Sequence, residues 1–440
     1  MSTGRTAREV ALLALTACEQ QGAWSDGFLK IAIRDAGLDG RDAGLATRLC
    51  FGVLQNRMLL DFHLSAFCKL PLETLEVRIR NNMRLGAYQL LLLDRVPDSA
   101  AVNESVNLAR KYSKNPRAAG MVNAVLRNLA RSREDLPQPA DLATRFSQPD
   151  WRVKEFDLAL GEDGTEALLA ADNGQPPTMA QVNTLRYTPE QVLDALRAGG
   201  VDARPHPWLP GCLLLTGTGD LEELAAFRDG AFYIQDGAAR LAVLAAGPEP
   251  GMRVLDACAA PGGKSFAAAI AMENRGEIWS CDIHPHKETL IRAGARRLGL
   301  DIIHTAVQDG KARRAGWEES FDLVIADVPC SGLGIIRKKP DIRYKAPEPL
   351  AALPAVQSAI LDNVAGYVRP GGVLLYSTCT LLERENGAVV DGFLAKHFDF
   401  TLEPFQLPGP FGTVAEGRIT LWPHLHDTDG FYMARLRKRG

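Results

Sequence analysis

Hydrophobic residues follow a helical rhythm in the first third of the chain. Over residues 1–133, long stretches such as 83–93 are rich in apolar positions, and strand-type alternation is scarce. Val102, Val106 and Ala109 recur at the three- to four-residue spacing of one helix face. The pattern predicts a compact, all-helical domain of six or seven helices.

From about residue 241 the pattern changes, and short apolar runs alternate with helical segments. The runs predicted as strands are Arg253–Asp256, Glu277–Asp282, Ile302–Val307, Phe321–Asp327, Gly372–Ser377 and Gly430–Leu436. Such alternation is typical of a mostly parallel sheet with helices on both faces. We therefore expect an α/β, Rossmann-like domain in this part of a multidomain chain.

Between these two regions lies a segment of mixed character. Residues 134–150 are polar and rich in proline, which favours a domain boundary. After it, two short apolar runs at 180–183 and 211–215 predict strands, and 189–198 predicts a helix. The predicted organisation is a helical domain over 1–135, a linker over 136–150, a small α+β domain over 151–240 and the α/β domain over 241–440.

Composition agrees with a folded chain in the cytoplasm. Of the 440 residues, 46% are hydrophobic and 23% charged, and no apolar run reaches the length of a membrane span. Arg5 and Arg8 precede an apolar stretch that resembles an export signal, but Glu9 interrupts it and the stretch is short. Helical spacing of its apolar residues favours a helix. We expect no membrane association.

The cysteines and histidines give no sign of a disulfide framework or a metal site. Eight cysteines are scattered without a Cys-x-x-Cys pair, which favours reduced thiols. The His284/His286 and His424/His426 pairs have no further ligands nearby in the sequence. We expect no bound metal.

Positive charge is concentrated in the helical region. The net charge of the chain is −3, but residues 1–135 hold 19 Lys and Arg against 14 Asp and Glu, a net +5. Seven basic residues and no acid lie between Ser105 and Arg133. They are Arg110, Lys111, Lys114, Arg117, Arg127, Arg131 and Arg133. A solvated helix surface is the plain alternative, whereas a basic face is typical of contact with nucleic-acid phosphates.

A glycine-containing turn follows the first predicted strand of the α/β domain. Asp256 ends the strand, and Gly262 and Gly263 precede a helix, so free backbone N–H groups can meet a ligand there. Asp282, Asp309 and Asp327 stand at or just after the ends of the next three strands. The turn is neither Gly-x-Gly-x-x-Gly nor a Walker loop, which disfavours NAD and ATP. The sequence predicts a cofactor that carries a nucleoside.

Two cysteines follow neighbouring strands. Cys330 comes just past the strand that ends at Asp327, after Pro329, and Cys379 comes just past the next one, after Thr378. Neighbouring strands lie roughly 5 Å apart, so both thiols can flank one pyrimidine ring. A thiolate that adds to carbon 6 of cytosine makes carbon 5 able to accept a methyl group. Positive charge must favour the thiolate, and the candidates are Lys264, Arg337, Lys338 and Lys339.

These motifs together resemble the Sun/Fmu family of RNA 5-methylcytosine methyltransferases. The matching segments are 256–264 (Asp-Ala-Cys-Ala-Ala-Pro-Gly-Gly-Lys), 327–334, 337–343, 376–380, 429–434, 146–151 and 235–236. The helical region is similar to the NusB-like RNA-binding domain of the bacterial 16S rRNA member. Val328 and Ser265 depart from the usual pattern, and neither departure removes a reacting group.

The resemblance implies roles that spacing leaves open. Cys379 is expected to be the nucleophile, Cys330 to assist release of the covalent adduct, and Asp327 to face the cytosine. S-adenosylmethionine is the expected cofactor. Its expected binding residues are Cys258, Ala259, Ala260, Pro261, Gly262, Gly263, Lys264, Asp282, Asp309 and Asp327. The expected substrate is 16S rRNA, naked or in a partly assembled small subunit, at cytosine 967 in the usual bacterial numbering, and the expected state is a monomer.

Three other interpretations stay open at the level of sequence. The target can be a different rRNA cytosine or a tRNA cytosine. The chain can be an RNA-binding assembly factor with an inert methyltransferase domain, although intact Asp327, Cys330 and Cys379 speak against this. A dinucleotide-dependent oxidoreductase would bind nicotinamide instead of a sulfonium.

Overall fold

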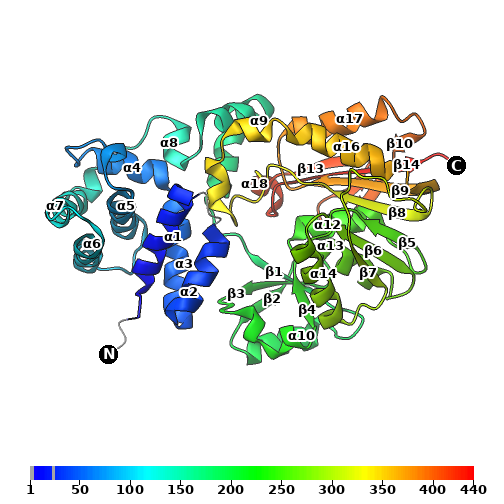
Figure 1. Ribbon diagram of the computed structural model, residues 1–440, viewed down its shortest axis with the longest axis horizontal. Helices are drawn as coiled ribbons and strands as arrows, with labels where there is room; N and C mark the ends of the chain where they lie inside the picture. The colour runs from blue at the N-terminus through cyan, green and yellow to red at the C-terminus, as the bar shows by residue number, and fades with distance from the viewer. Residues whose placement is uncertain (1–3, 22–24) are drawn as a thin grey trace. The chain divides into compact units, whose positions relative to one another are not determined.

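The computed structural model describes residues 4–21 and 25–440 and divides into two compact units. Unit 1 comprises the chain up to Gly174 together with Ile336–Lys345. Unit 2 comprises Gln175–Ile335 and Ala346–Gly440. The chain therefore leaves unit 2 once, for ten residues, and then returns to it (Figure 1).

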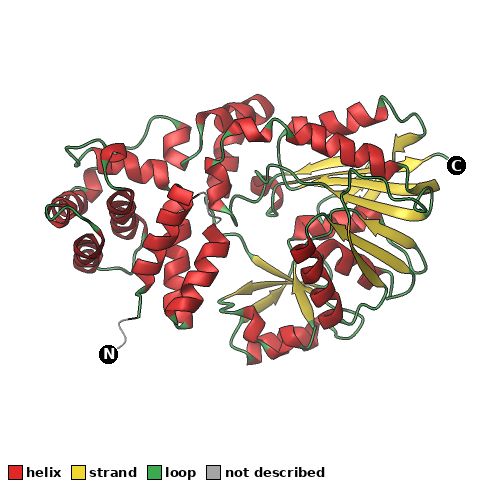
Figure 2. Ribbon diagram, in the orientation of Figure 1, coloured by secondary structure: helices red, strands yellow, loops and turns green. Residues whose placement is uncertain are grey.

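Unit 1 is built from helices alone among its described residues (Figure 2). Its α-helices are α1 (Ala7–Gln21), α2 (Ser25–Ala36), α3 (Gly40–Gln55), α4 (Arg57–Ser65), α5 (Val77–Leu92), α6 (Asp98–Tyr112), α7 (Ala118–Arg131), α8 (Leu142–Phe146) and α9 (Asp150–Asp172). Its 3₁₀ helices are η1 (Leu72–Thr74), η2 (Arg133–Asp135) and η4 (Pro340–Tyr344). The described part of the first 133 residues thus holds seven α-helices, which confirms the all-helical prediction.

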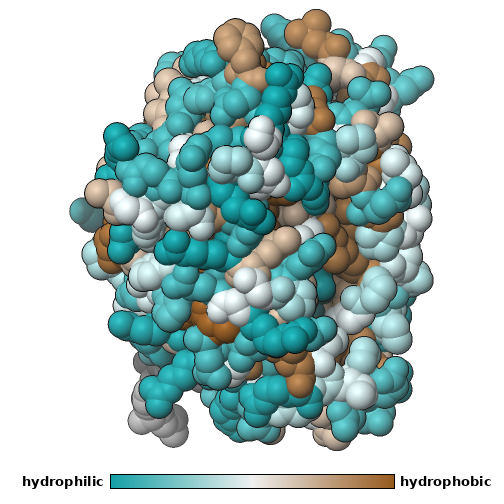
Figure 3. Space-filling view, turned by 90° about the vertical axis from the view of Figure 1, so that its right-hand side faces the viewer, coloured by the Kyte–Doolittle hydropathy of each residue, from teal (hydrophilic) through white to brown (hydrophobic). Residues whose placement is uncertain are grey.

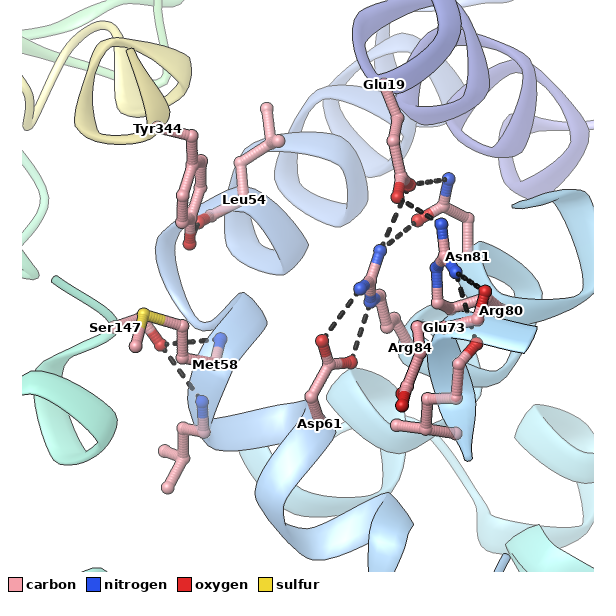
Figure 4. A network of polar contacts seen from close by, with 12 residues as sticks. Glu19, Leu54, Met58, Asp61, Glu73, Arg80, Asn81, Arg84, Ser147 and Tyr344 are labelled. Atoms are coloured by element: carbon pink, nitrogen blue, oxygen red, sulfur yellow. Dashed lines mark hydrogen bonds and ion pairs between the residues drawn. The ribbon is translucent and has the colours of Figure 1, made fainter. Parts of the chain in front are cut away.

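A polar network centred on the buried Arg84 ties three of these helices together (Figure 4). The Arg84 guanidinium on α5 donates to both carboxylate oxygens of Asp61 on α4, each at 2.7 Å, and to Glu19 on α1 at 3.1 Å. Burial alone would lower the Arg84 pKa, but the two carboxylates raise it. The guanidinium therefore stays charged and joins α1, α4 and α5.

The segment predicted as a linker packs against the helical domain. Ser147 is fully buried, and its hydroxyl accepts hydrogen bonds from the N–H groups of Met58 and Leu59 at the start of α4, both at 3.1 Å (Figure 4). Farther along, Arg152 and Asp172 form a fully buried ion pair at 2.9 Å. The break between compact units therefore falls after residue 174. The divisions expected at 135, 150 and 240 stay predictions.

Residues 336–345, here called the arm, belong to the interior of unit 1. Arg343 is fully buried, and one of its nitrogens donates to the carbonyl oxygens of Gln55 and Phe146 at 3.0 and 3.2 Å. The Tyr344 hydroxyl donates to the Leu54 carbonyl at 2.6 Å (Figure 4). The arm is therefore held by backbone carbonyls of the helical unit.

Unit 2 contains a small antiparallel sheet with the strand order β2-β3-β1-β4. The strands are β1 (Thr178–Val182), β2 (Asp202–Pro205), β3 (Cys212–Thr216) and β4 (Phe232–Ile234), accompanied by α10 (Pro189–Ala198), η3 (Leu221–Glu223) and α11 (Ala225–Arg228). The two predicted strands correspond to β1 and β3, and the predicted helix to α10. The sequence reading missed the edge strands β2 and β4.

The larger sheet of unit 2 has the order β10-β14-β9-β8-β5-β6-β7, with β13 also paired to β14. Its strands are β5 (Arg253–Asp256), β6 (Glu277–Asp282), β7 (Ile303–Val307), β8 (Phe321–Asp327), β9 (Val368–Thr378), β10 (Phe400–Leu402), β13 (Arg418–Leu421) and β14 (Phe431–Lys438). Strands β5 to β9 pair in parallel, and β14 is antiparallel to β9. This mixed sheet confirms the predicted α/β domain. A separate hairpin joins β11 (Phe405–Leu407) and β12 (Gly412–Val414).

Helices cover both faces of this sheet (Figure 1). The covering helices are α12 (Gly237–Ala246), α13 (Gly263–Ala271), α14 (Pro285–Leu298), α16 (Leu353–Ala365) and α17 (Gly387–Leu394). The shorter helices α15 (Pro347–Leu350), η5 (Glu383–Glu385) and α18 (Pro423–His426) lie in the connecting segments. Successive residues of β5 point to opposite sides, so Val254 packs in the core beneath α12 to α14 and Leu255 in the core beneath α16 and α17. The helices cover the faces of the sheet, and the carboxyl ends of the parallel strands are the expected place for the site.

The surface drawn in Figure 3 is mostly hydrophilic, with hydrophobic residues interspersed. Exposed apolar side chains such as Phe398 and Leu425 are ordinary on folded domains. Within 4–21 and 25–440, no helix combines the length and apolar character needed to span a bilayer.

Candidate active site

The two cysteines of the predicted pair lie in contact. Cys330 follows β8 and Cys379 directly follows β9, and these parallel strands are neighbours with Asp327 opposite Ser377. The Sγ atoms are 3.3 Å apart, and both side chains are half-buried. Since parallel strands end at the same edge of a sheet, the pairing of β8 with β9 is what brings the two thiols together.

An ion pair lies beside the cysteines. Lys264, in the first turn of α13, donates to Asp327 Oδ2 at 2.6 Å, and the Ser377 hydroxyl donates to Asp327 Oδ1 at 2.8 Å. Burial alone would lower the Lys264 pKa, but Asp327, Asp256 and Cys379 raise it. Lys264 is therefore a fixed positive charge next to the Cys379 sulfur.

The surroundings of Cys330 disfavour ionisation of its thiol. The hydrogen bond with Cys379, burial and the negative charges of Cys379 and Glu385 raise the pKa of Cys330 well above its usual value. Two interacting thiols at this distance do not both ionise near neutral pH. Cys330 is therefore the member of the pair that keeps its proton.

The turn after β5 forms a narrow cradle. Gly262 has a φ of +111°, and a Cβ atom on it would lie 2.4 Å from the ring of Phe266. Helix α13 starts at Gly263, so its first N–H groups point out of the helix without intrahelical partners. Ala259 is fixed by a 2.7 Å hydrogen bond from its N–H to the Cys281 carbonyl. The turn therefore offers backbone donors and no side-chain bulk.

Carboxylates line the same edge of the sheet. Asp282 is the last residue of β6 and accepts a hydrogen bond from the His284 N–H at 3.0 Å. Asp309 lies two residues beyond β7 and accepts one from the Lys311 N–H at 2.9 Å. Asp256 is fully buried, and burial raises its pKa to about 7. These acids and the glycine turn fit an adenosyl group, whose hydroxyls and amino group are hydrogen-bond donors.

Two glycines let the cysteine loops cross the C-terminal segment. Gly334 donates its N–H to the Cys379 carbonyl at 2.9 Å, and Gly430 donates to the Gly334 carbonyl at 2.8 Å. A Cβ atom on Gly334 would lie 1.9 Å from the carbonyl oxygen of Gly430. Only glycine fits this backbone contact, which explains why motifs distant in sequence carry these residues.

Of the four cations predicted near the thiolate, the structure places Lys264 at the site within unit 2. Arg337, Lys338 and Lys339 belong to the arm in unit 1. The sequence prediction did not include the buried polar residues Gln357, Glu385 and Asn386 near the cysteines, and it gave Ser377, which lies in the segment 376–380, no role of its own. Their only signal in the sequence is a position a few residues from the Thr-Cys motif or on a helix between the two cysteine motifs.

The seven basic residues are all exposed and lie on α6, α7, the loop between them and the start of η2; they are here called the basic surface. Arg110, Arg127 and Arg131 donate to asparagine side chains one turn earlier, so their charges stay uncompensated by these contacts. By contrast, Lys111 pairs with Glu9 at 2.8 Å and Arg133 pairs with Asp98. In the basic surface, Arg110, Arg127 and Arg131 are thus oriented by neutral asparagine side chains.

Three family models match the chain. They are 16S rRNA methyltransferase RsmB/F over residues 243–437, the NusB family over 5–131 and the RsmF/B-like ferredoxin-like domain over 148–222. A Bacillus subtilis protein named probable ribosomal RNA small subunit methyltransferase B is 38% identical over 98% of this chain and 99% of its own length. The chain belongs to the RsmB/F family. A Pectobacterium atrosepticum relative, named ribosomal RNA small subunit methyltransferase B, is 30% identical over the full length of both chains.

Solved structures agree with this assignment at the level of fold. A protein described as PH0851 has a TM-score of 0.81 and 24% identity over 99% of both chains. NSun6 from Pyrococcus horikoshii, solved with SFG, has a TM-score of 0.59 and 21% identity over 66% of this chain and 98% of its own. Family membership makes this chain a methyltransferase dependent on S-adenosylmethionine, with a NusB-like helical part and a ferredoxin-like part. It confirms the resemblance, the fold class and the cofactor predicted from the sequence.

Proposed function

We propose that this chain transfers a methyl group to carbon 5 of a cytosine in 16S rRNA through a covalent cysteine adduct. The observation that supports it most is the 3.3 Å contact between the sulfur atoms of Cys330 and Cys379 beside Lys264 and Asp327. The names of the relatives support the substrate class, and family analogy suggests cytosine 967.

The residues around the β5 turn would hold the cofactor. S-adenosylmethionine, when bound, supplies a methyl group on a sulfonium. The turn from Cys258 to Lys264 would contact its polar groups through backbone N–H donors. Asp282 would accept hydrogen bonds from the ribose hydroxyls, and Asp309 from the adenine amino group. Asp327 would face the base.

The cysteines would divide the covalent chemistry between them. Cys379 attacks carbon 6 of the cytosine as a thiolate stabilised by the charge of Lys264. Asp327, an acceptor while ionised, takes a hydrogen bond from the exocyclic amino group of the base. Release also requires that carbon 5 lose its proton to a base, since the electron pair of that C–H bond restores the C5–C6 double bond and expels the Cys379 thiolate. Cys330 keeps its proton and hydrogen-bonds the leaving sulfur, which assists release.

Incubation with labelled S-adenosylmethionine and undermethylated 16S rRNA tests the proposal. We expect the wild type to label the RNA, Cys379→Ala to be inactive, and Cys330→Ala to accumulate an RNA adduct that survives a denaturing gel. An active Cys379→Ala together with a Cys330→Ala unable to form the adduct would invert the roles. No label from the wild type would favour the inert assembly factor.

The basic surface supports RNA as the partner, because exposed arginines with neutral neighbours suit phosphate contacts. The RNA would be bound naked or in a partly assembled subunit, by a monomeric cytoplasmic protein. A different rRNA cytosine or a tRNA cytosine is the competing target. Bisulfite mapping of RNA from a strain that lacks the gene discriminates these targets, since one position alone should lose its modification.

A further inference from the structure

Two adjacent buried side chains, Glu385 and Asn386, each bracket one of the two cysteines. Glu385 ends η5 and Asn386 precedes α17, and their exposed fractions are 0% and 1%. A carboxylate and an amide buried to this degree need hydrogen-bond partners. Their partners lie immediately before and after the reacting residues.

Glu385 holds the loop around Cys330. Its Oε2 atom accepts a hydrogen bond from the Ser331 N–H at 2.9 Å and another from the Gln357 amide at 2.8 Å. The same Gln357 amide donates to the Pro329 carbonyl at 3.0 Å. The backbone is thus fixed on both sides of Cys330 by a charge-assisted network anchored on α16.

Asn386 does the same for Cys379. Its Oδ1 atom accepts a hydrogen bond from the Thr378 hydroxyl at 2.6 Å, and its Nδ2 donates to the Thr380 carbonyl at 3.1 Å. These contacts span the cysteine from the residue before it to the residue after it. One amide side chain therefore sets the position of the Cys379 loop.

The two bracketed loops are also joined to each other. The hydroxyls of Ser331 and Thr380, one residue beyond each cysteine, are 2.7 Å apart. The Tyr376 hydroxyl on β9 donates to the Glu385 carbonyl at 2.6 Å, which fixes the Glu385 backbone to the strand that carries Cys379. The sulfur–sulfur distance therefore depends on this polar cluster as well as on the sheet.

We propose that Glu385 and Asn386 are positioning residues that fix the two cysteine loops at the separation needed for formation and release of the covalent adduct. Asn386 would serve the attack by Cys379, and Glu385 would serve release through Cys330. The proposal rests on the proposed function. A displacement of about 1 Å in a reacting group can cost about a hundredfold in rate, so small loop shifts have large effects.

The tendency of the two cysteines to form a disulfide measures their separation without RNA or cofactor. Each molecule of oxidised glutathione converts the two thiols into one disulfide and yields two molecules of reduced glutathione. The equilibrium constant of this exchange is an effective concentration, which falls when the loops loosen. Trypsin releases Cys330 in residues 315–337 and Cys379 in 346–384, so the linked peptide can be quantified by mass spectrometry.

We expect Glu385→Ala and Asn386→Ala to lower the effective concentration by about tenfold or more. Glu385→Gln should stay within about threefold of the wild type, because its carbonyl oxygen can accept both hydrogen bonds. Glu383→Gln, on the exposed side of the same η5 helix, is the matched control and should have no effect. Binding of S-adenosylmethionine verifies the fold of each variant. Wild-type values for both alanine variants would overturn the proposal.

If Glu385→Ala fails to fold, Gln357→Leu keeps the proposal testable, because it removes the link to the Pro329 carbonyl and leaves the carboxylate in place. It should lower the effective concentration by roughly threefold to tenfold, and an unchanged value would count against the Cys330 bracket.

Single-turnover kinetics then separates the two positioning roles. Asn386→Ala should slow adduct formation, and Glu385→Ala should let the adduct accumulate, each with kcat reduced more than KM and with Glu385→Gln restoring release. Failure of cytosine methylation with the expected glutathione results would refute the proposed function alone. Unchanged effective concentrations with intact methylation would refute the positioning roles alone.

Discussion

Asp256 offers a direct thermodynamic test of the electrostatics at the cofactor edge. Its side chain is fully buried at the end of β5, and burial raises its pKa from 3.8 to about 7, although the Ser265 hydroxyl donates to it at 2.7 Å. Asp256→Asn keeps the shape and the acceptor for Ser265 but removes the ionisation. We expect the variant to gain stability relative to the wild type as pH rises.

The sign follows from proton binding. Between about pH 4 and pH 7 the folded wild type holds a proton at Asp256 that the unfolded chain has lost, so its stability falls with rising pH. Each pH unit within this window costs about 1.4 kcal/mol, and above about pH 7 the cost is constant. From pH 5 to pH 8 the wild type should lose roughly 2 to 3 kcal/mol relative to Asp256→Asn.

Hydrogen exchange in urea, followed on peptides of β5 and β6 without cofactor, measures this difference locally in unit 2. A local probe is needed because a chain with two compact units need not unfold in one step. Asp301→Asn, at an exposed position of the same unit, is the control and should show no such trend. A free-energy difference between Asp256→Asn and wild type that stays constant from pH 5 to pH 8 would refute the reasoning.

Three further results are expected. Gly262→Ala should weaken S-adenosylmethionine binding by about tenfold to a hundredfold in calorimetry, since the strain and the Phe266 clash cost about 1 to 3 kcal/mol, whereas Gly251→Ala, with a φ of +90° and open space, should bind normally. Charge reversal of Arg110, Arg127 and Arg131 should reduce the slope of log RNA affinity against log salt concentration by about 2. Lys111→Ala should change this slope less, because Glu9 already neutralises the Lys111 charge. An unchanged slope in the arginine variant would show that these residues are solvated and do not contact phosphates. Asp172→Ala should destabilise unit 1 by about 3 to 5 kcal/mol in thermal unfolding because it leaves Arg152 buried without its carboxylate, while the exposed Asp163→Ala should stay within about 0.5 kcal/mol of wild type.

The sequence predicts the parallel strands well because their signal is strong. The limits of β6 and β8 match the expectation residue for residue, since most residues of each strand are buried and each strand ends in an aspartate. Those terminal aspartates also mark the edge of the sheet where the site forms. Strand position and site position are therefore predicted together, from the same residues.

Two short strands at the edges of the small sheet are not predicted from the sequence. The edge strand β2 (Asp202–Pro205) has four residues, of which one is buried, and it ends in proline. The other edge strand, β4 (Phe232–Ile234), has three residues. Strands of three or four residues contain at most two repeats of the two-residue alternation, which is too few for a recognisable pattern, so only pairing with β3 and β1 makes them strands.

Buried polar residues are the second class that the sequence hides. Ser147 and Gln148 are fully buried, although their polar, proline-flanked context indicates an exposed linker. Glu385 and Asn386 lie in a polar run that suggests a surface turn. Composition averages over neighbours, whereas burial of a single polar group depends on partners distant in the chain, such as Ser331 and Thr380.

The arm gives the clearest case, because the sequence predicts its Arg337, Lys338 and Lys339 near the thiolate, whereas the fold assigns the arm to unit 1. The Arg343 guanidinium donates to three backbone carbonyls and to the Asn173 side chain within unit 1, and burial lowers its pKa. Backbone carbonyl oxygens stabilise this buried cation by their dipoles. The site of Arg343 therefore depends on how the segments that carry Gln55, Phe146 and Asp172 come together in the fold. Only five residues separate Cys330 from the start of the arm, and the Cys330 loop therefore needs its own anchors within unit 2. Glu385 and Gln357 are placed to provide them.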